Sequence, residues 1–292
     1  MFNDVIPLNI KVAGQASFVH LPGHELDPEA YADDRLNVYV DHAFRHYKQV
    51  LLNTPDVWRW FAERKILLTH ELIETFSLGF ADRTLCKDYR REKGRRSEIV
   101  RGAWQVLGLL KPSGHQYFHG DVVVPIYDDQ AHIVGAYGRR VSPEQRPGHV
   151  YHHHWYNGDA TFFNRSALSP CDRVILCKSP IEALTLLSAG FTNVIATMGI
   201  FSFGHHHLAE LDRIRPTEVV LAFDNSDTGN HVAGMVAQAL DAYEIPCLRL
   251  PLPRNKDINA FVHGYDDHVP ELERIIDAAF PYQQTYENLV RR

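Results

Sequence analysis

The chain has 292 residues, of which 45% are hydrophobic and 23% charged, so it can bury one sizeable core or two modest ones. Its formal net charge of −6 excludes a wholesale polycation, and any contact with nucleic acid must therefore use a local basic surface. The sequence shows neither an apolar run of roughly 20 residues nor a signal-peptide pattern, which predicts a cytoplasmic protein without a membrane partner.

The first half of the chain predicts an arm, several helices and a β-hairpin. Residues 1–35, rich in Pro, Gly, Asp and Glu, are expected to form the arm. Apolar residues recur at helical spacing over 37–61, with a break where Thr54 is a candidate N-cap and Pro55 a first helical residue. A helix capped by Thr69 follows, and then a short one around 103–110. Two apolar runs, joined by a polar turn within 121–141, predict the hairpin.

Strands and helices alternate in the second half of the chain. Strands are expected near 173–177, 193–197, 218–223 and 247–250, with a C-terminal helix over 271–280. Such alternation is typical of a parallel sheet covered by helices. The predicted fold class is therefore α/β. We expect an α+β N-terminal subdomain over 36–168, a parallel α/β domain over 169–265, and a C-terminal helical segment over 266–292.

Neither the cysteines nor the histidines predict a zinc site. The four cysteines (Cys86, Cys171, Cys177 and Cys247) include no C-x-x-C pair, which a zinc ribbon or finger requires. Histidine triplets occur at 152–154 and 205–207. Three successive side chains point in different directions and rarely converge on one ion. We interpret both triplets as a polar surface or a helix start, and no zinc is expected.

Residues 173–229 carry the most informative motif. RVILCKSP is an apolar strand that opens a helix, and EVVLAFDNSDTG is a strand that ends on Asp224, with Gly229 opening the next helix. This arrangement resembles the Toprim domain of bacterial-type primases, topoisomerases and related nucleases. In that family the first strand ends in Glu-Gly and the third in Asp-x-Asp-x-x-Gly. The Glu, the Gly and the second Asp are replaced here by Lys178, Ser179 and Ser226.

The resemblance covers about residues 40–262 and is specific to the catalytic core of primases of bacteria and mobile elements. HYKQVLLNTPDVWRWFAERKILLTHELIETFSLGFAD resembles the helical start of that core, with Gly79 and Phe80 in its last motif. DVVVPIYDDQAHIVGAYGRRV is similar to the family's hairpin. No counterpart of the family's zinc-binding or helicase-binding module is evident. Template selection or helicase recruitment is therefore expected from a protein partner.

The resemblance implies a divalent metal at the carboxyl edge of the parallel sheet. Clustered carboxylates there suit Mg²⁺ or Mn²⁺, the ions expected to serve nucleotidyl transfer. The family pattern assigns Asp224 and Asp257 as ligands and places Asn259 beside the second of them. Asp227 is a weaker candidate ligand, because the turn would have to rearrange. Lys178 stands at the position of the catalytic Glu.

The Lys178 ammonium changes the expected chemistry of this site. Unit charges 4 Å apart interact by roughly 4 kcal/mol at an effective dielectric constant of 20, so its repulsion predicts weak metal binding and impaired transfer. Alternatively, Lys178 takes the place of one metal, by pairing with Asp224 or by gripping phosphate, and binding survives without polymerisation. A third alternative is that the lysine at position 178 was introduced deliberately. That substitution alone would not explain the altered motif, because Ser226 also stands in place of an acid.

Two basic segments are candidates for contact with nucleotide or nucleic acid. By the resemblance, Arg139 and Arg140 fall where the family's arginine contacts template or nucleotide. A guanidinium suits phosphate because it donates two parallel hydrogen bonds. The densest basic run surrounds Tyr89 and predicts either a solvated loop or a surface that tracks phosphates. Its members are Lys87, Arg90, Arg91, Lys93, Arg95 and Arg96.

Three functions follow from the resemblance. The favoured one is a primase-like protein that binds single-stranded DNA and nucleotides during replication of a bacterium or mobile element, with transfer impaired by Lys178 and Ser226. The alternatives are an active metal-dependent DNA primase and a non-catalytic scaffold for a protein partner. A Toprim nuclease is least favoured, because the upstream helical and hairpin segments resemble those of primases.

Overall fold

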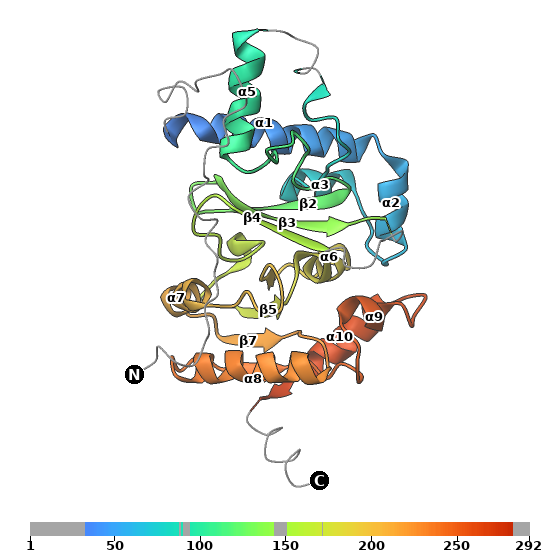
Figure 1. The fold of residues 1–292 in the computed structure, drawn as a ribbon. Coiled ribbons are helices and arrows are strands. Elements are labelled where there is room, and N and C mark those ends of the chain that lie inside the picture. The colour runs from blue at the N-terminus through green and yellow to red at the C-terminus, as the bar shows by residue number, and fades with distance from the viewer. Residues whose placement is uncertain (1–32, 88, 90–93, 143–150, 171, 283–292) are drawn as a thin grey trace. The chain divides into compact units, whose positions relative to one another are not determined.

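A computed structural model describes residues 33–282 except 88, 90–93, 143–150 and 171 (Figure 1). The described chain forms two compact units. The antiparallel unit comprises the described parts of 33–60 and 69–160, and the parallel unit comprises those of 61–68 and 161–282. Each contains one sheet. The predicted α/β class, with an α+β part before a parallel sheet, is confirmed, whereas the predicted arm lies outside the described residues.

The antiparallel unit combines helices with a four-stranded sheet in the order β1-β2-β3-β4. The helices in this part of the chain are α1 (Asp33–Leu52), α2 (Pro55–Ala62), α3 (His70–Phe76) and α5 (Arg95–Val106). The strands are β1 (Gly79–Phe80), β2 (Asp121–Tyr127), β3 (Ile133–Arg140) and β4 (His152–Tyr156). Strands β2 and β3 form the predicted hairpin.

Local signals in the sequence explain how the helices of this unit begin and pack. The Thr69 hydroxyl accepts a hydrogen bond from the Leu72 amide at 3.0 Å, which confirms the predicted N-cap of α3. Tyr47 of α1 is fully buried, and its ring lies edge-on to that of Phe118. Position 79 must be glycine, because an added Cβ would lie 2.6 Å from the Tyr47 Cβ where β1 meets α1.

The parallel unit holds a five-stranded sheet in the order β6-β5-β7-β8-β9. Strands β5 (Arg173–Cys177), β6 (Val194–Ala196), β7 (Glu218–Leu221) and β8 (Cys247–Arg249) are parallel and lie where they were predicted. Strand β9 (Phe280–Pro281) pairs antiparallel to β8. The helices are α6 (Pro180–Ser188), α7 (His205–Ile214), α8 (Asp227–Asp241), α9 (Ile258–Val262) and α10 (Val269–Asp277).

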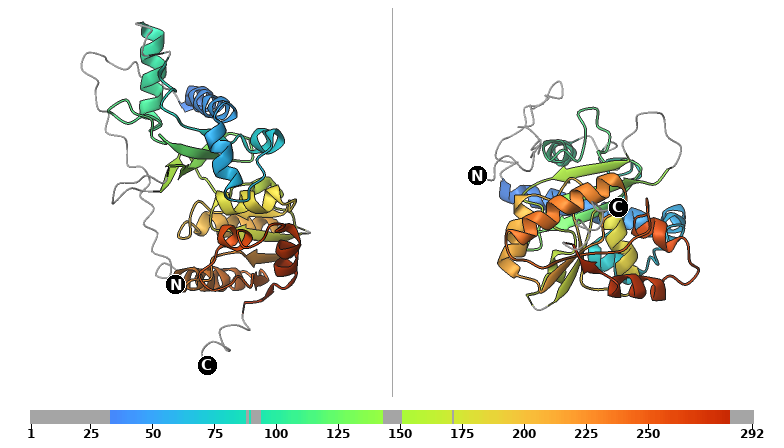
Figure 2. Two further views of the ribbon diagram at one scale, coloured as in Figure 1. Left: turned by 90° about the vertical axis from the view of Figure 1, so that its right-hand side faces the viewer. Right: turned by 90° about the horizontal axis from the view of Figure 1, so that it is seen from below.

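One face of the parallel sheet packs against α7 and α8, the second of which is the orange helix in Figure 2. The residues buried there come from alternate positions of β5 and β7 and from the two helices: Val174, Leu176, Val219, Leu221, Leu208, Leu211, Val232 and Val236. Parallel pairing also brings the carboxyl ends of the strands to one edge, where open α/β sheets bind ligands. Within the described ranges, no helix is long and apolar enough to cross a membrane.

Candidate active site

Four charged side chains meet at the carboxyl edge of the parallel sheet. Lys178 follows β5, and its Nζ lies 2.7 Å from Asp224 Oδ1, which follows β7. The same Nζ lies 3.2 Å from Glu182 Oε1 on the first turn of α6. Asp257, the N-cap of α9, is the third acid, at 3.6 Å from Nζ to Oδ2. One ammonium thus contacts three carboxylates, and we call these four residues the Lys178 cluster.

The ion pairs of the Lys178 cluster bias its protonation toward the charged forms of Lys178 and Asp224. Burial acts to lower the pKa of Lys178, but Glu182, Asp224 and Asp257 together raise it above its ordinary value. Burial likewise acts to raise the pKa of Asp224, and hydrogen bonds from Lys178 and Ser226 outweigh it and hold that pKa below its usual range. The ammonium and the Asp224 carboxylate therefore form a stable ion pair.

Glu182 is the deepest acid of the cluster. Its side chain is 2% exposed, and burial raises its pKa to about 8 against the opposing effect of Lys178. Its Oε2 atom has no hydrogen-bond partner among the described residues. The structure places this helix acid in contact with the ammonium of Lys178.

Backbone geometry around Asp224 explains the glycine of the motif. Ser226 caps α8, because its Oγ accepts a hydrogen bond from the Gly229 amide at 3.0 Å. The same hydroxyl donates to Asp224 Oδ2. A Cβ added at Gly229 would lie 2.1 Å from the Asp224 carbonyl oxygen and 2.8 Å from its carboxylate carbon. Only glycine allows the helix to begin this close to the acid.

Two residues that the sequence analysis did not select also hold the site in place. Arg249 of β8 is 5% exposed and donates to the Asp224 carbonyl at 3.0 Å and to the Leu221 carbonyl at 3.2 Å. Thr197, after β6, donates to the Lys178 carbonyl at 3.1 Å. The signal for Arg249 was a charge inside the apolar segment CLRLPL.

The remaining predicted acids and amide take other positions. Asp227 is exposed in the first turn of α8 and is not among the carboxylates that contact Lys178. Asn259 donates its side-chain amide to Thr185 Oγ1 of α6 at 2.7 Å. Asn259 therefore ties α9 to α6, and no contact between it and the Lys178 ammonium is observed in the described chain.

With the ammonium in place, this donor set does not fit a divalent metal. The three carboxylates converge on the Lys178 Nζ, so a cation already lies at their common centre. Among the described residues, no group of three or more His, Cys, Asp or Glu side chains is arranged to hold a metal ion. Metal binding by Asp224, Asp257 or Asp227 stays a prediction.

In the antiparallel unit, one of the two hairpin arginines, Arg140, contacts a buried acid. Asp121 has no exposed surface, and its carboxylate lies 3.1 Å from Arg140 Nε and 2.6 Å from His153 Nδ1. Burial raises the pKa of Asp121 although His153 and Arg140 oppose it. Arg140 also donates to the His119 carbonyl. We call Asp121, His119, Arg140 and His153 the Asp121 cluster.

Arg139 points to a different set of side chains. Its guanidinium contacts His152 and lies 5.9 Å from the centre of the Tyr151 ring. The histidine triplet at 152–154, expected to be a polar surface or helix start, is instead part of strand β4, because its backbone pairs with β3. Only the middle member diverges: His153 lies against Asp121, whereas His152 and His154 both lie against Tyr137.

The basic run around Tyr89 is only partly described. Lys87 and Arg96 are exposed. Arg95 begins α5, but its side chain lies outside the described residues, as do Arg90, Arg91 and Lys93 entirely. The second histidine triplet does begin a helix, α7. There His207 is buried, accepts from the Gly204 amide at 3.2 Å and donates to the Thr161 carbonyl at 2.9 Å, which is a structural role.

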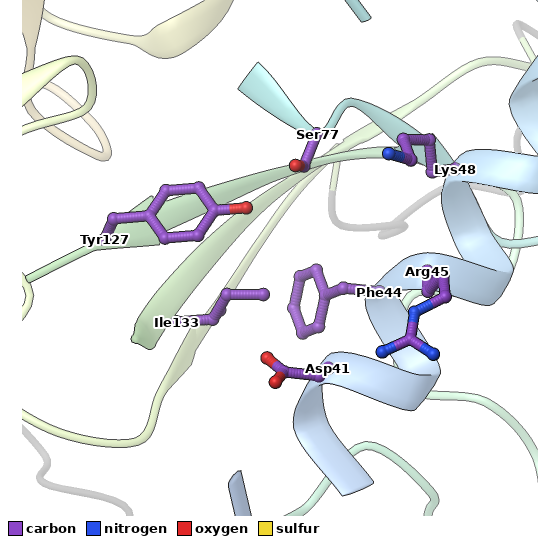
Figure 3. Close-up of a pocket in the computed structure, with 7 residues that line it drawn as sticks. All are labelled: Asp41, Phe44, Arg45, Lys48, Ser77, Tyr127 and Ile133. Carbon is purple, nitrogen blue, oxygen red and sulfur yellow. The ribbon is translucent and has the colours of Figure 1, made fainter. Parts of the chain in front are cut away.

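Figure 3 shows a pocket of the antiparallel unit between α1 and the β2–β3 hairpin. Its volume is about 170 Å³, below the roughly 300 Å³ at which ligand pockets usually start. Lys48, one of its cations, is already paired with Glu74 at 2.7 Å. The pocket therefore supports no cofactor assignment. Its lining residues are Asp41, Phe44, Arg45, Lys48, Ser77, Tyr127 and Ile133.

Known proteins match the chain in both sequence and fold. Residues 175–262 match the Toprim-like family. The DNA primase of Enterococcus faecalis is 22% identical over 84% of this chain and 41% of its own length. The DNA primase of Campylobacter jejuni is 26% identical over 72% of this chain and 34% of its own length. The DNA primase of Aquifex aeolicus is 22% identical over 92% of this chain and 54% of its own length. The chain thus spans about a third to a half of the relatives' length.

Solved structures agree with the sequence matches. The zinc-binding and RNA polymerase domains of the Aquifex aeolicus primase superpose with a TM-score of 0.72 at 21% identity, covering 91% of this chain and 68% of that one. A DnaG primase catalytic domain bound to single-stranded DNA gives 0.65 at 18% identity, covering 87% and 84%. This likeness shows the fold of the primase catalytic core.

Proposed function

We propose that this chain, which has the fold of the primase catalytic core and carries a Toprim-like domain, binds single-stranded DNA during DNA replication but is impaired in nucleotidyl transfer. One observation carries the second half of the proposal. The Lys178 ammonium lies among Asp224, Glu182 and Asp257, at the edge where the family resemblance expects a divalent metal. No step of a metal-dependent reaction is assigned to these residues.

Electrostatics favours the ammonium over a metal in this position. A divalent ion close to Lys178 would be repelled by its charge, at a cost of roughly 4 kcal/mol per unit charge 4 Å away. The ion would also have to compete for Asp224, whose carboxylate already accepts hydrogen bonds from Lys178 and Ser226. Ser226 cannot replace the missing acid, since its hydroxyl caps α8.

Binding of DNA is supported by the basic side chains of the antiparallel unit. Arg139 and Arg140 are both partly exposed, and Lys87 and Arg96 are exposed. Because the chain carries a formal net charge of −6, these local cations have to provide the attraction for phosphates. A solved relative of the same fold, a DnaG catalytic domain, binds single-stranded DNA.

A titration of a labelled oligo-dT strand by fluorescence anisotropy tests the proposal, in EDTA and in Mg²⁺, at several salt concentrations. We expect equal affinity with and without metal and a clear decrease with salt. The Lys87→Ala/Arg96→Ala variant should lower the slope of log K against log salt by about 1.4, at roughly 0.7 per phosphate contact. Arg59→Ala is the matched control, since Arg59 is 69% exposed and paired with Asp56.

The alternative functions predict other outcomes. Binding that requires Mg²⁺ would favour an active metal-dependent primase. Absence of binding even at low salt would contradict the proposal and favour the scaffold for a protein partner. Such a partner would also supply template selection or helicase recruitment.

A further inference from the structure

Two loops at the carboxyl edge of the parallel sheet present side chains that the Lys178 cluster does not use. Phe201, in the loop between β6 and α7, is 77% exposed and is the most exposed large apolar side chain among the described residues. Arg254 and Lys256 lie in the loop between β8 and α9. Neither cation forms an ion pair with a carboxylate of the described chain, and Arg254 is exposed.

The loop that carries Phe201 is fixed to the sheet where it begins. The Thr197 amide donates to the Cys177 carbonyl at 3.1 Å, and the Thr197 hydroxyl donates to the Lys178 carbonyl at 3.1 Å. Phe201 follows four residues later, so it lies within about 14 Å of Thr197 by the reach of an extended chain. The aromatic ring is therefore held near this edge of the sheet.

The loop that carries the two cations is held by the neighbouring loop after β7. The Asn225 amide donates to the Lys256 carbonyl at 3.1 Å, and the Asn255 amide donates back to the Asn225 carbonyl at 2.7 Å. The Asn225 side chain adds a hydrogen bond to the Leu252 carbonyl at 2.7 Å. These bonds fix the loop backbone and so limit the positions open to Arg254 and Lys256.

The spacing between the two loops suits a short length of single strand. In the order β6-β5-β7-β8, strands β6 and β8 are separated by three steps. At about 4.8 Å per step this is about 14 Å, a distance that a few nucleotides of a single strand can span. An aromatic ring that stacks on a base, combined with cations that contact the backbone, is the usual arrangement for binding a single strand.

We propose that single-stranded DNA lies across this edge, with a base stacked on Phe201 and phosphates bound by Arg254 and Lys256. The inference rests on the proposed function and adds to it a second DNA contact, on the parallel unit. Lys178 is not one of the phosphate contacts, because three carboxylates already surround its ammonium. The excess of acid there also explains why the phosphates would lie against separate cations.

Two variants separate stacking from charge in the oligo-dT titration. Phe201→Ala should weaken binding by about fivefold or more and leave the salt slope unchanged, because stacking is not a charge contact. Arg254→Ala/Lys256→Ala should lower the salt slope by about 1.4. Phe201→Trp should retain the affinity, and its fluorescence should be quenched as the strand binds.

Matched controls come from the opposite edge of the same sheet. Tyr243 is a 40% exposed aromatic that follows α8, and Arg213 lies in the last turn of α7 with its side chain 62% exposed. Tyr243→Ala and Arg213→Ala should leave both affinity and slope unchanged. If Phe201→Ala binds oligo-dT as tightly as the natural chain, or if the control variants lose as much affinity as Phe201→Ala, the inference is overturned while the proposed function stands. If the natural chain binds no oligo-dT, both fail.

Discussion

The Lys178 cluster of the parallel unit and the Asp121 cluster of the antiparallel unit are built around single charges of opposite sign. In the first, one ammonium contacts three carboxylates, of which Glu182 is almost fully buried. In the second, one buried carboxylate contacts a guanidinium and an imidazole. The first cluster contains more acid than base, whereas in the second the guanidinium of Arg140 balances the single carboxylate. Phosphate is therefore expected at Arg140 and at separate cations, rather than at Lys178.

The comparison also shows which charges are structural. Leaving a buried ion without a partner of opposite charge costs free energy, so each cluster depends most on its single cation or its single anion. This is the Lys178 ammonium in the parallel unit and the Asp121 carboxylate in the antiparallel unit. Arg140 shares Asp121 with His153, whereas no second cation contacts the three acids around Lys178 among the described residues.

Removal of Lys178 should have the largest effect. Lys178→Ala leaves three acids facing one another, and we expect the free energy of unfolding to fall by about 3–5 kcal/mol. Urea denaturation measures the change. Lys48→Ala is the control, because it removes a single ion pair with Glu74, whose side chain is 59% exposed, and should cost about 1 kcal/mol or less. Equal losses in the two variants would contradict the account.

The same variant tests whether the ammonium stands in for a metal. In Lys178→Ala the three carboxylates are left without a cation, so added Mn²⁺ should raise the melting temperature of the variant. The natural chain should show no such rise, because the Lys178 ammonium already lies among the three acids. A rise in the natural chain alone would show that its cluster does bind metal.

Arg140→Ala should have a smaller effect. Asp121 keeps His153 at 2.6 Å, and the lost contacts are the ion pair with Asp121 and the hydrogen bond to the His119 carbonyl, so we expect a loss of about 2 kcal/mol in stability. Loss of a phosphate contact should also weaken binding of oligo-dT. Urea denaturation and anisotropy measure the two effects. A stability loss larger than that of Lys178→Ala would reverse the comparison.

The smallest effect expected is on the pH dependence of stability. The pKa of Glu182 is raised to about 8 in the folded state, so its contribution is fully present below the unfolded pKa of about 4.5 and is lost as pH rises toward 8. Glu182→Gln carries no such proton. Its stability relative to the natural chain should therefore rise by about 1 kcal/mol between pH 5 and pH 6. A constant difference across this range would contradict the assigned pKa shift.

Much of the fold was predictable because its signals are local. The apolar runs of β5 and β7, and the cap at Thr69, need only neighbouring residues to be recognised. Strand β4 was missed because its histidines lie on a partly exposed strand and obtain their structure from pairing with β3. The two-residue strands β1 and β9 were missed because they carry no periodic signal of their own.

The site was predictable only in part. Asp224 and Asp257 stand at strand and helix ends that the motif identifies, and the pairing of Lys178 with Asp224 was one of the stated alternatives. The contact with Glu182 and the bonds of Arg249 depend on tertiary packing across separate elements. Sequence spacing alone could not show that Glu182 belongs to the site, because an acid in the first turn of a helix often has only a structural role.

The central claim is that Lys178 occupies the place of the metal and that the chain binds DNA without extending it. Oligonucleotide synthesis on single-stranded DNA, measured in Mg²⁺ and in Mn²⁺, tests it most directly. We predict no product from the natural chain and a gain of metal-dependent product in Lys178→Glu/Ser226→Asp. Robust metal-dependent synthesis by the natural chain, abolished by Asp224→Ala, would contradict the account.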